Sequence, residues 1–210
     1  MLLLVSGASG VGKSTARRHL RRILDERGVG ERYETAELCT LGAVPEVPSI
    51  AWRQQQVEVA VRRAVDLEAR GRHLVFAGDP VPVGEALAAP SADRIDIAAC
   101  LLDLDDRSHV ARLTGRGEPA ELIPLHRSFA AWLRAHATDP GHATEAVRND
   151  AWREMRWDRW VDRAPGPEWS MTVLDTTDLT PEEVGTALAT WCTRATTGGA
   201  PVFRAGWFEG

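Results

Sequence analysis

The sequence predicts an α/β protein built on a parallel, doubly wound sheet, and three observations support this fold class. Apolar runs suited to strands alternate along the chain with amphipathic segments suited to helices. The strand-like runs are continuously apolar, as expected where helices cover both faces of a parallel sheet. A glycine-rich turn directly follows the first run. Ligands of such sheets bind beyond the carboxyl ends of the strands, so this turn marks the expected binding edge.

The strands are predicted where aliphatic residues run together and turn-forming residues follow. Their expected bounds, in chain order, are 2–5, 33–38, 73–77, 97–104 and 171–174. A loop with two prolines is expected at 42–49. Because a helix is predicted between most neighbouring strands, the connections are expected to be right-handed crossovers.

The helices are predicted from apolar residues at i, i+3 and i+4 and from the signals that begin and end a helix. Asp105 or Asp106 is expected to cap one helix, and Thr180, followed by Pro181 and Glu183, is a strong start for the last one. The expected bounds are 13–27, 50–70, about 106–115, 122–162 with a break at 139–141, and 180–195.

The domain organisation follows from the length of 210 residues, which fits one domain with an insertion. We expect a single domain at 1–195, with an inserted lid at about 115–163. Residues 196–210 are rich in glycine and are expected to form a tail, although Phe203, Trp207 and Phe208 could dock it.

The bulk composition restricts the partners and the location. A net charge of −5 argues against nucleic acid as the main partner. The apolar start of the chain is far shorter than the ~20 residues that span a bilayer, so we expect no membrane association and a cytoplasmic protein. The three cysteines have no metal-ligand spacing and are expected to be reduced thiols. Lys13 is the only lysine in the chain.

That lysine belongs to a G-x-x-x-x-G-K-[ST] motif, which reads Gly7-Ala8-Ser9-Gly10-Val11-Gly12-Lys13-Ser14. Glycines allow positive φ and bring the backbone close to a phosphate, while amides at a helix start bind its charge. Lys13 is expected to bridge the β- and γ-phosphates, Ser14 to bind Mg²⁺, and Thr15 to lie near the α-phosphate. The motif stands between a predicted strand and a predicted helix, as a phosphate-binding loop (P-loop) requires.

A carboxylate that assists Mg²⁺ or accepts a proton should end the strand beside the first one. Asp79, after the strand at 73–77, is the preferred candidate, and its alternative role is that of a turn residue before Pro80. Asp103 and Asp105, after the next strand, are rivals, although Asp105 is also a candidate helix cap.

With these residues in view, the chain resembles the P-loop small-molecule and nucleotide kinases, such as shikimate, gluconate and adenylyl-sulfate kinases and antibiotic O-phosphotransferases. The resemblance covers about residues 1–195, and its specific part is the phosphate loop. It implies a P-loop NTPase fold with a five-stranded parallel sheet of order 2-3-1-4-5, helices on both faces and a helical lid insertion. It also implies ATP and Mg²⁺ as cofactors, with Ser14 and Asp79 at the metal.

The resemblance further implies where the lid and the nucleoside lie. Arg112 and Arg116 would open the lid and close on the ATP phosphates and adenine, because a guanidinium binds phosphate oxygens bidentately. The alternative is that both are solvated arginines at a helix end. The loop at 175–178, with Thr176 and Thr177, would edge the adenine.

The acceptor is expected between the second strand and the long helix. Members of the family carry an acidic residue at the end of that strand and an arginine early in the helix. Glu34 and Glu37 fit the first place, and Arg53, beside Trp52, fits the second. The chain departs from the pattern by having glutamate rather than aspartate and glutamines after the arginine. It also has the sequence Gly78-Asp79-Pro80 in place of a Gly-Gly pair.

Tryptophans gather in and after the expected lid, at Trp132, Trp152, Trp157, Trp160 and Trp169. On a helix, Trp152, Arg156 and Trp160 would share one face and could form a wall around an acceptor. The preferred interpretation is that the rings anchor the lid by packing. His136 and His142 have no defensible metal-ligand spacing and are expected at the surface.

The sequence therefore predicts an ATP-dependent phosphotransferase that moves the γ-phosphate to a hydroxyl of a small molecule. Lys13, Asp79, Arg112 and Arg116 are the expected catalytic residues. One alternative is a nucleotide-dependent switch or accessory ATPase that acts with a protein partner. A further alternative is a polynucleotide end kinase, which would need a basic groove. The sequence assigns neither the acceptor nor an oligomeric state.

Overall fold

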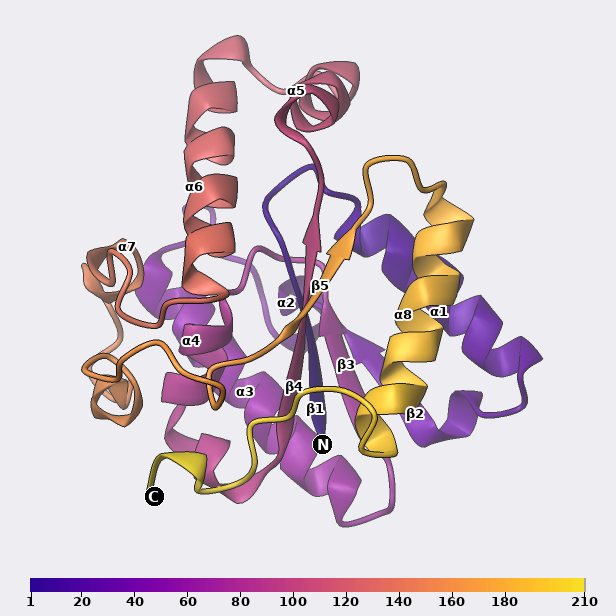
Figure 1. Ribbon diagram of the computed structural model, residues 1–210, viewed down its shortest axis with the longest axis vertical. Coiled ribbons are helices and arrows are strands. Elements are labelled where there is room, and N and C mark those ends of the chain that lie inside the picture. Colours follow the sequence, from indigo (N-terminus) through magenta and orange to yellow (C-terminus); the bar gives the residue numbers. More distant parts are fainter. Residues whose placement is uncertain (210) are drawn as a thin grey trace.

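The computed structural model describes residues 1–209, in which a five-stranded parallel sheet forms the centre of the molecule (Figure 1). The strand order is β2-β3-β1-β4-β5, as predicted. Every pairing between neighbouring strands is parallel. The bounds are β1 Leu2–Ser6, β2 Tyr33–Ala36, β3 His73–Ala77, β4 Ile97–Asp103 and β5 Thr172–Asp175.

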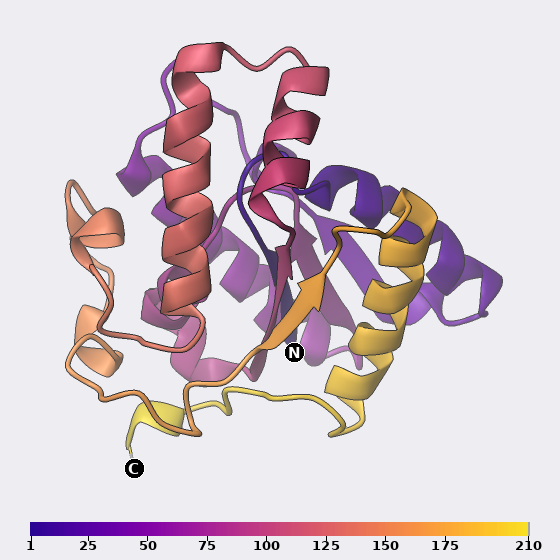
Figure 2. The ribbon, with the colours of Figure 1, turned by 45° about the horizontal axis from the view of Figure 1, so that its top comes forward.

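Helices cover both faces of this sheet. α1 and α8 pack side by side on one face, while α3 and α4 pack on the other (Figure 1). α5 lies beyond the carboxyl ends of the strands, and α6 runs from there back alongside the sheet (Figure 2). The bounds are α1 Lys13–Glu26, α2 Leu38–Leu41, α3 Ile50–Glu68, α4 Val83–Ala88, α5 Asp106–Gly115, α6 Ile123–His136, α7 Glu145–Arg148 and α8 Pro181–Thr196. Short 3₁₀ turns lie at η1 Gly30–Arg32, η2 Pro90–Arg94, η3 Ala120–Leu122, η4 Trp157–Arg159 and η5 Trp207–Glu209.

The central strands explain the continuous apolar runs in the sequence. Every residue of β1 is buried, and so are six of the seven residues of β4. Each leucine buried in this way contributes about 1.5–3 kcal/mol relative to an exposed one. β5 is one of the two edge strands, and its side chains alternate between half-buried and exposed, with Val173 at 53% exposure. The core is therefore centred on β1 and β4, directly below the phosphate loop.

The helix caps show which of Asp105 and Asp106 caps α5, and they confirm the predicted start of α8 at Thr180. Asp105 caps α5, because its carboxylate accepts from the Ser108 amide at 2.8 Å. Thr180 and Glu183 form the capping box at the start of α8. An unexpected box lies at α2, where the Thr40 hydroxyl accepts from the Glu37 amide at 3.0 Å. This box ends β2 at Ala36, so the predicted strand at 33–38 was too long.

The prediction of one broken helix at 122–162 was wrong after residue 136. The Arg156 amide donates to the Ala88 carbonyl at 2.7 Å, and the Trp152 amide donates to Gln54 Oε1 at 2.8 Å. These amides bond to the body of the protein instead of to carbonyls one turn back. Trp152, Arg156 and Trp160 therefore do not share a helix face.

Most of the tryptophans pack into the core. Trp132, Trp160 and Trp169 are buried around His136, whose ring stacks on Trp132 with centroids 4.7 Å apart. The prediction that His136 lies at the surface was wrong, since its exposure is 1%. Burial lowers the pKa of His136 to about 4. His142 is exposed, as predicted.

The C-terminal segment packs beneath the sheet, at the end opposite the phosphate loop (Figure 2). Phe203 is buried and pairs antiparallel with Ile97, the first residue of β4. The guanidinium of Arg163 lies over the Trp207 ring, 4.9 Å from its centroid. The aromatic residues of the tail thus fasten it to the body. Among residues 1–209, no helix is both long enough and apolar enough to cross a membrane.

Candidate functional site

The phosphate loop connects the carboxyl end of β1 to the amino end of α1. Gly7, Gly10 and Gly12 all have positive φ, at 144°, 89° and 99°. A Cβ at Gly7 would lie 2.7 Å from the Leu102 carbonyl oxygen, and a Cβ at Gly10 would lie 2.8 Å from Leu113 Cδ2. Other residues would therefore be strained in this turn. The turn leaves the first amides of α1 at the edge of the sheet, where a helix start favours an anion.

Lys13 folds back over this loop and is nearly buried, with an exposure of 4%. Its Nζ donates to the carbonyls of Gly7 at 2.7 Å and Ala8 at 2.8 Å. Burial, opposed by the charge of Asp79 and assisted by that of Arg116, lowers the pKa of Lys13 to about 7. A bound anion would restore the lysine's charge, so the site is set up for phosphate.

Two carboxylates face the loop from the neighbouring strands. Glu37 Oε2 lies 3.4 Å from the Ser14 hydroxyl, and Glu37 Oε1 accepts from Arg17 Nη2 at 2.6 Å. Gly78 makes room for this residue, since a Cβ there would lie 2.5 Å from Glu37 Oε2. Asp79 follows and accepts from the Leu38 amide at 2.8 Å. Glu37, predicted as an acceptor ligand, thus lies nearer to Ser14 than the sequence indicated.

Asp103 and Asp105, the alternatives to Asp79, bind other groups and lie away from the phosphate loop. Asp103 pairs with Arg134 at 2.8 Å, and Asp105 caps α5. Both line a separate hollow beside β5 that contains no residue of the phosphate loop.

The predicted lid arginines reach the phosphate loop from α5 and its end. Arg112 donates to the carbonyls of Val11 at 3.2 Å and Thr176 at 2.8 Å. Arg116 Nη2 donates to the Ser9 hydroxyl at 3.1 Å, and the same guanidinium pairs with Glu118. His109, which the sequence analysis missed, lies with Nε2 2.7 Å from the Ser9 carbonyl. His109 belongs to no sequence motif, so the sequence alone did not mark it as a site residue.

A cavity of about 400 Å³ lies over the loop. It is lined by Ser9, Gly10, Gly12, Lys13, Ser14, Thr15, Gly78, Asp79, Pro80, Arg112 and Arg116. The structure therefore brings together the predicted loop residues, both arginines and Asp79. We call this space the phosphate cavity.

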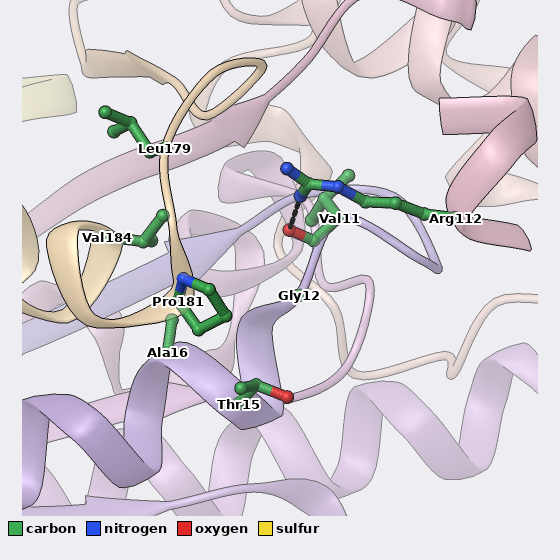
Figure 3. A pocket seen from close by; sticks show the side chains of 8 residues that line it. All are labelled: Val11, Gly12, Thr15, Ala16, Arg112, Leu179, Pro181 and Val184. Atoms are coloured by element: carbon green, nitrogen blue, oxygen red, sulfur yellow. Dashed lines mark hydrogen bonds between the residues drawn. The ribbon is translucent and has the colours of Figure 1, made fainter. Parts of the chain in front are cut away.

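A second cavity, of about 210 Å³, adjoins the phosphate cavity, and the two share Gly12, Thr15 and Arg112 (Figure 3). Its other walls are Val11, Ala16, Leu179, Pro181 and Val184. Thr176 and Thr177 do not line it. Thr176 is buried behind Arg112, and the Thr177 hydroxyl accepts from the Asp105 amide at 2.9 Å. The apolar wall comes instead from the start of α8, which the sequence had marked only as a helix cap.

A third cavity, of about 270 Å³, adjoins the phosphate cavity on the other side, and the two share Asp79 and Pro80. We call it the acceptor cavity. It is lined by Leu38, Cys39, Val44, Pro48, Ser49, Ile50, Trp52, Arg53, Asp79 and Pro80. The predicted pair of Trp52 and Arg53 is therefore present here.

Glu34 does not reach any of these cavities. It lies in β2, and its carboxylate is held by Arg63 through bonds of 2.8 Å from both Nε and Nη2. Arg53 is held by Glu85, a buried residue of α4 that the sequence analysis missed. Glu85 lies 32 residues from Arg53, so no local pattern links the two.

The fold can be compared with solved structures. An unliganded sugar kinase from Janibacter sp. HTCC2649 superposes with a TM-score of 0.50 and 17% identity, over 91% of this chain and 94% of that one. A gluconokinase from Sinorhizobium meliloti 1021 gives a TM-score of 0.53 and 15% identity, over 93% of both chains.

The chain has the fold of small-molecule kinases. The fold class and strand order expected from the resemblance are thereby confirmed. At these identities the likeness concerns the fold alone. No family model and no curated protein matches the sequence.

Proposed function

We propose that the protein is an ATP-dependent phosphotransferase that transfers the γ-phosphate to a hydroxyl of a small molecule. The observation that carries this proposal is the row of adjoining cavities. The phosphate cavity lies in the middle, shares Thr15 and Arg112 with the apolar cavity beside α8, and shares Asp79 with the acceptor cavity. A nucleoside, a triphosphate tail and an acceptor would fit this row in that order.

The phosphate loop would hold the triphosphate. Its amides and Lys13 would bind the phosphate oxygens, and Thr15 would lie toward the α-phosphate. The nucleoside would then lie against Leu179 and Pro181, which wall the cavity shown in Figure 3. Arg112 and Arg116 would neutralise the charge that develops on the transferring group.

Transfer would join an acceptor oxygen to the γ-phosphorus and break the bond from that phosphorus to the β,γ-bridging oxygen, which leaves with ADP. Asp79 lines both cavities that meet at this point. It would orient the hydroxyl and accept its proton. Glu37, nearer to Ser14, is more suited to the metal side of the phosphate cavity.

The residues beside the loop fit Mg²⁺, which prefers hydroxyl and carboxylate oxygens. Ser14 would hold the ion directly, Glu37 would hold it directly or through water, and Asp79 would hold it through water. When bound with the nucleotide, the ion would supply positive charge to the β- and γ-phosphates.

A screen of acceptors tests the proposal. ADP formation from ATP and Mg²⁺ is measured with nucleosides, sugars, amino-acid alcohols and aminocyclitols, and Lys13→Ala serves as the inactive control. ADP formation that depends on one class of acceptor, with a phosphorylated product in the mass spectrum, is the expected result.

Two other results would replace this proposal. Turnover that rises only when a protein partner is added would favour the switch or accessory ATPase. Turnover that rises only with oligonucleotides, and falls with salt, would favour the polynucleotide end kinase.

A further inference from the structure

The acceptor cavity contains one arginine, and its charge is already matched. Arg53 Nε donates to Glu85 Oε2 at 2.9 Å, and Arg53 Nη2 donates to Glu85 Oε1 at 2.5 Å. This bidentate pair occupies one of the two edges with which a guanidinium can bind a carboxylate, and it already supplies a matching negative charge. Among the hydrogen bonds within residues 1–209, none engages Arg53 Nη1, which is left to donate to an oxygen of a ligand.

The pair is fixed in place by its surroundings. Glu85 has no exposed surface, and Gln54 Nε2 donates to its Oε1 at 3.1 Å. Gln54 is itself buried and bonds to the Val147 carbonyl at 2.8 Å and the Trp152 amide at 2.8 Å. Separating Arg53 from Glu85 would leave a buried carboxylate without its partner, which is strongly unfavourable. Arg53 is therefore not free to turn toward an anionic ligand.

The remaining wall offers nothing that would balance a negative charge. Among the described residues that line the acceptor cavity, Arg53 is the only cation. Asp79 adds a negative charge at the boundary with the phosphate cavity.

Apolar side chains make up most of the wall. They are Leu38, Val44, Pro48, Ile50, Trp52 and Pro80. A carboxylate placed against them would lose water without gaining a partner, whereas the apolar face of a ring would gain from burial. The volume of about 270 Å³ lies just below the range for small-molecule sites, about 300–1,000 Å³, which suits one ring.

We propose that the acceptor is an uncharged, ring-sized alcohol with an apolar face, and that Glu85 sets this preference by neutralising Arg53. This inference rests on the proposed phosphotransferase function and names the class of its acceptor. Glu85 acts through Arg53 and is a positioning residue.

Matched pairs of acceptors test the inference on the wild-type protein. Each pair differs only in CH₂OH against carboxylate, as in 1-phenyl-1,2-ethanediol against mandelate and xylitol against xylonate. We expect kcat/KM for ADP formation to be at least about 100-fold higher for the neutral member, and higher for the aryl diol than for xylitol. A preference for the hydroxy acids would overturn the inference and leave the phosphotransferase proposal standing. If no acceptor in either the pairs or the wider screen raises ADP formation, both are rejected.

The variant Glu85→Gln tests the proposed cause. It keeps the shape of the side chain but removes the charge that neutralises Arg53. We expect the ratio of kcat/KM for acid over neutral acceptor to rise about 10-fold. Glu58→Gln is the matched control, because Glu58 is also buried, is also paired with an arginine, Arg62, and does not line the acceptor cavity. An equal ratio in wild type and Glu85→Gln would refute the role of Glu85. If Glu85→Gln does not fold, the wild-type ratio still decides the acceptor class.

Discussion

The phosphate cavity and the acceptor cavity adjoin each other, yet they are assembled in different ways. The phosphate loop is one continuous segment of eight neighbouring residues. Most of the groups with which it would bind a phosphate are backbone amides. The acceptor cavity is walled by side chains from 38–53 and 79–80, and its arginine is fixed by α4. Replacements in the phosphate loop are therefore expected to disrupt phosphate binding, whereas single replacements in the wall of the acceptor cavity are expected to change only which acceptor fits. The following predictions break or sharpen this contrast, from the largest expected effect to the smallest.

Replacing Lys13 should have the largest effect. Lys13→Ala removes the only ammonium side chain of the phosphate cavity, and we expect acceptor-dependent ADP formation to fall by at least about 10³-fold. Arg22→Ala, on the exposed side of the same helix, should keep wild-type turnover. Substantial turnover in Lys13→Ala would show that the loop does not bind the transferring phosphate.

Replacing Asp79 should separate chemistry from nucleotide binding. Asp79→Asn keeps the hydrogen bond from the Leu38 amide but cannot accept the hydroxyl proton, so we expect kcat to fall about 10²–10⁴-fold. Nucleotide affinity, measured by calorimetry, should change little. Asp103→Asn, which alters the rival carboxylate, should leave kcat near that of the wild type. Near-wild-type turnover in Asp79→Asn would remove this residue from the mechanism.

Replacing Trp52 should affect only the acceptor side. Trp52 is half-buried in the acceptor cavity, and Trp52→Ala is expected to raise KM for the acceptor about 10-fold while KM for ATP stays constant. Trp157→Ala is the control, because Trp157 packs on Trp160 with centroids 5.7 Å apart and lies outside the acceptor cavity. An equal rise in both KM values would mean that Trp52 supports the fold and not the acceptor.

Replacing His136 should change stability and not chemistry. Its folded-state pKa of about 4 lies below the ordinary 6.5, so the unfolded chain takes up a proton first as the pH falls. The free energy of unfolding should therefore decrease between pH 6.5 and 4, by up to about 3 kcal/mol from this residue. Burial also lowers the pKa of His73 to about 4, which adds a loss of the same sign.

Urea unfolding at pH 7 and pH 4.5 measures this loss. In His136→Leu, the free energy of unfolding should decrease less between pH 7 and pH 4.5 than in the wild type. In His142→Gln, where the replaced histidine is exposed, the decrease should equal that of the wild type. If the free energy of unfolding of His136→Leu depends on pH as it does in the wild type, then His136 is not a source of this loss.

The sequence predicted the fold well because its determinants are local. Apolar runs located the strands, and the glycine loop fixed which end of the sheet binds a ligand. The prediction failed where tertiary contacts replace local ones. The segment after residue 136 looked helical, but its backbone bonds to Gln54 and Ala88. His136 looked like a surface residue because nothing in its own segment shows that Trp160 and Trp169 fold over it.

In the candidate site, too, the positions of residues within a local motif were predicted correctly, and those of residues held by distant partners were not. The motif anticipated the loop residues of the phosphate cavity, and the family resemblance anticipated that Arg112 and Arg116 reach it. It misplaced Glu34, whose partner Arg63 lies in α3, and it did not anticipate Glu85. Both errors concern ion pairs between residues about 30 positions apart, which only folding brings together.

The solitary lysine gives this chain an unusual response to covalent labelling. An acylating reagent meets one lysine ε-amine, which is nearly buried over the phosphate loop and has a pKa of about 7. Modification at Lys13 would add one mass increment to the peptide that contains the phosphate loop, and we expect it to abolish nucleotide uptake at the same time. If a bound nucleotide protects Lys13 from acylation, the unmodified fraction of that peptide in the mass spectrum measures how much of the phosphate loop is occupied.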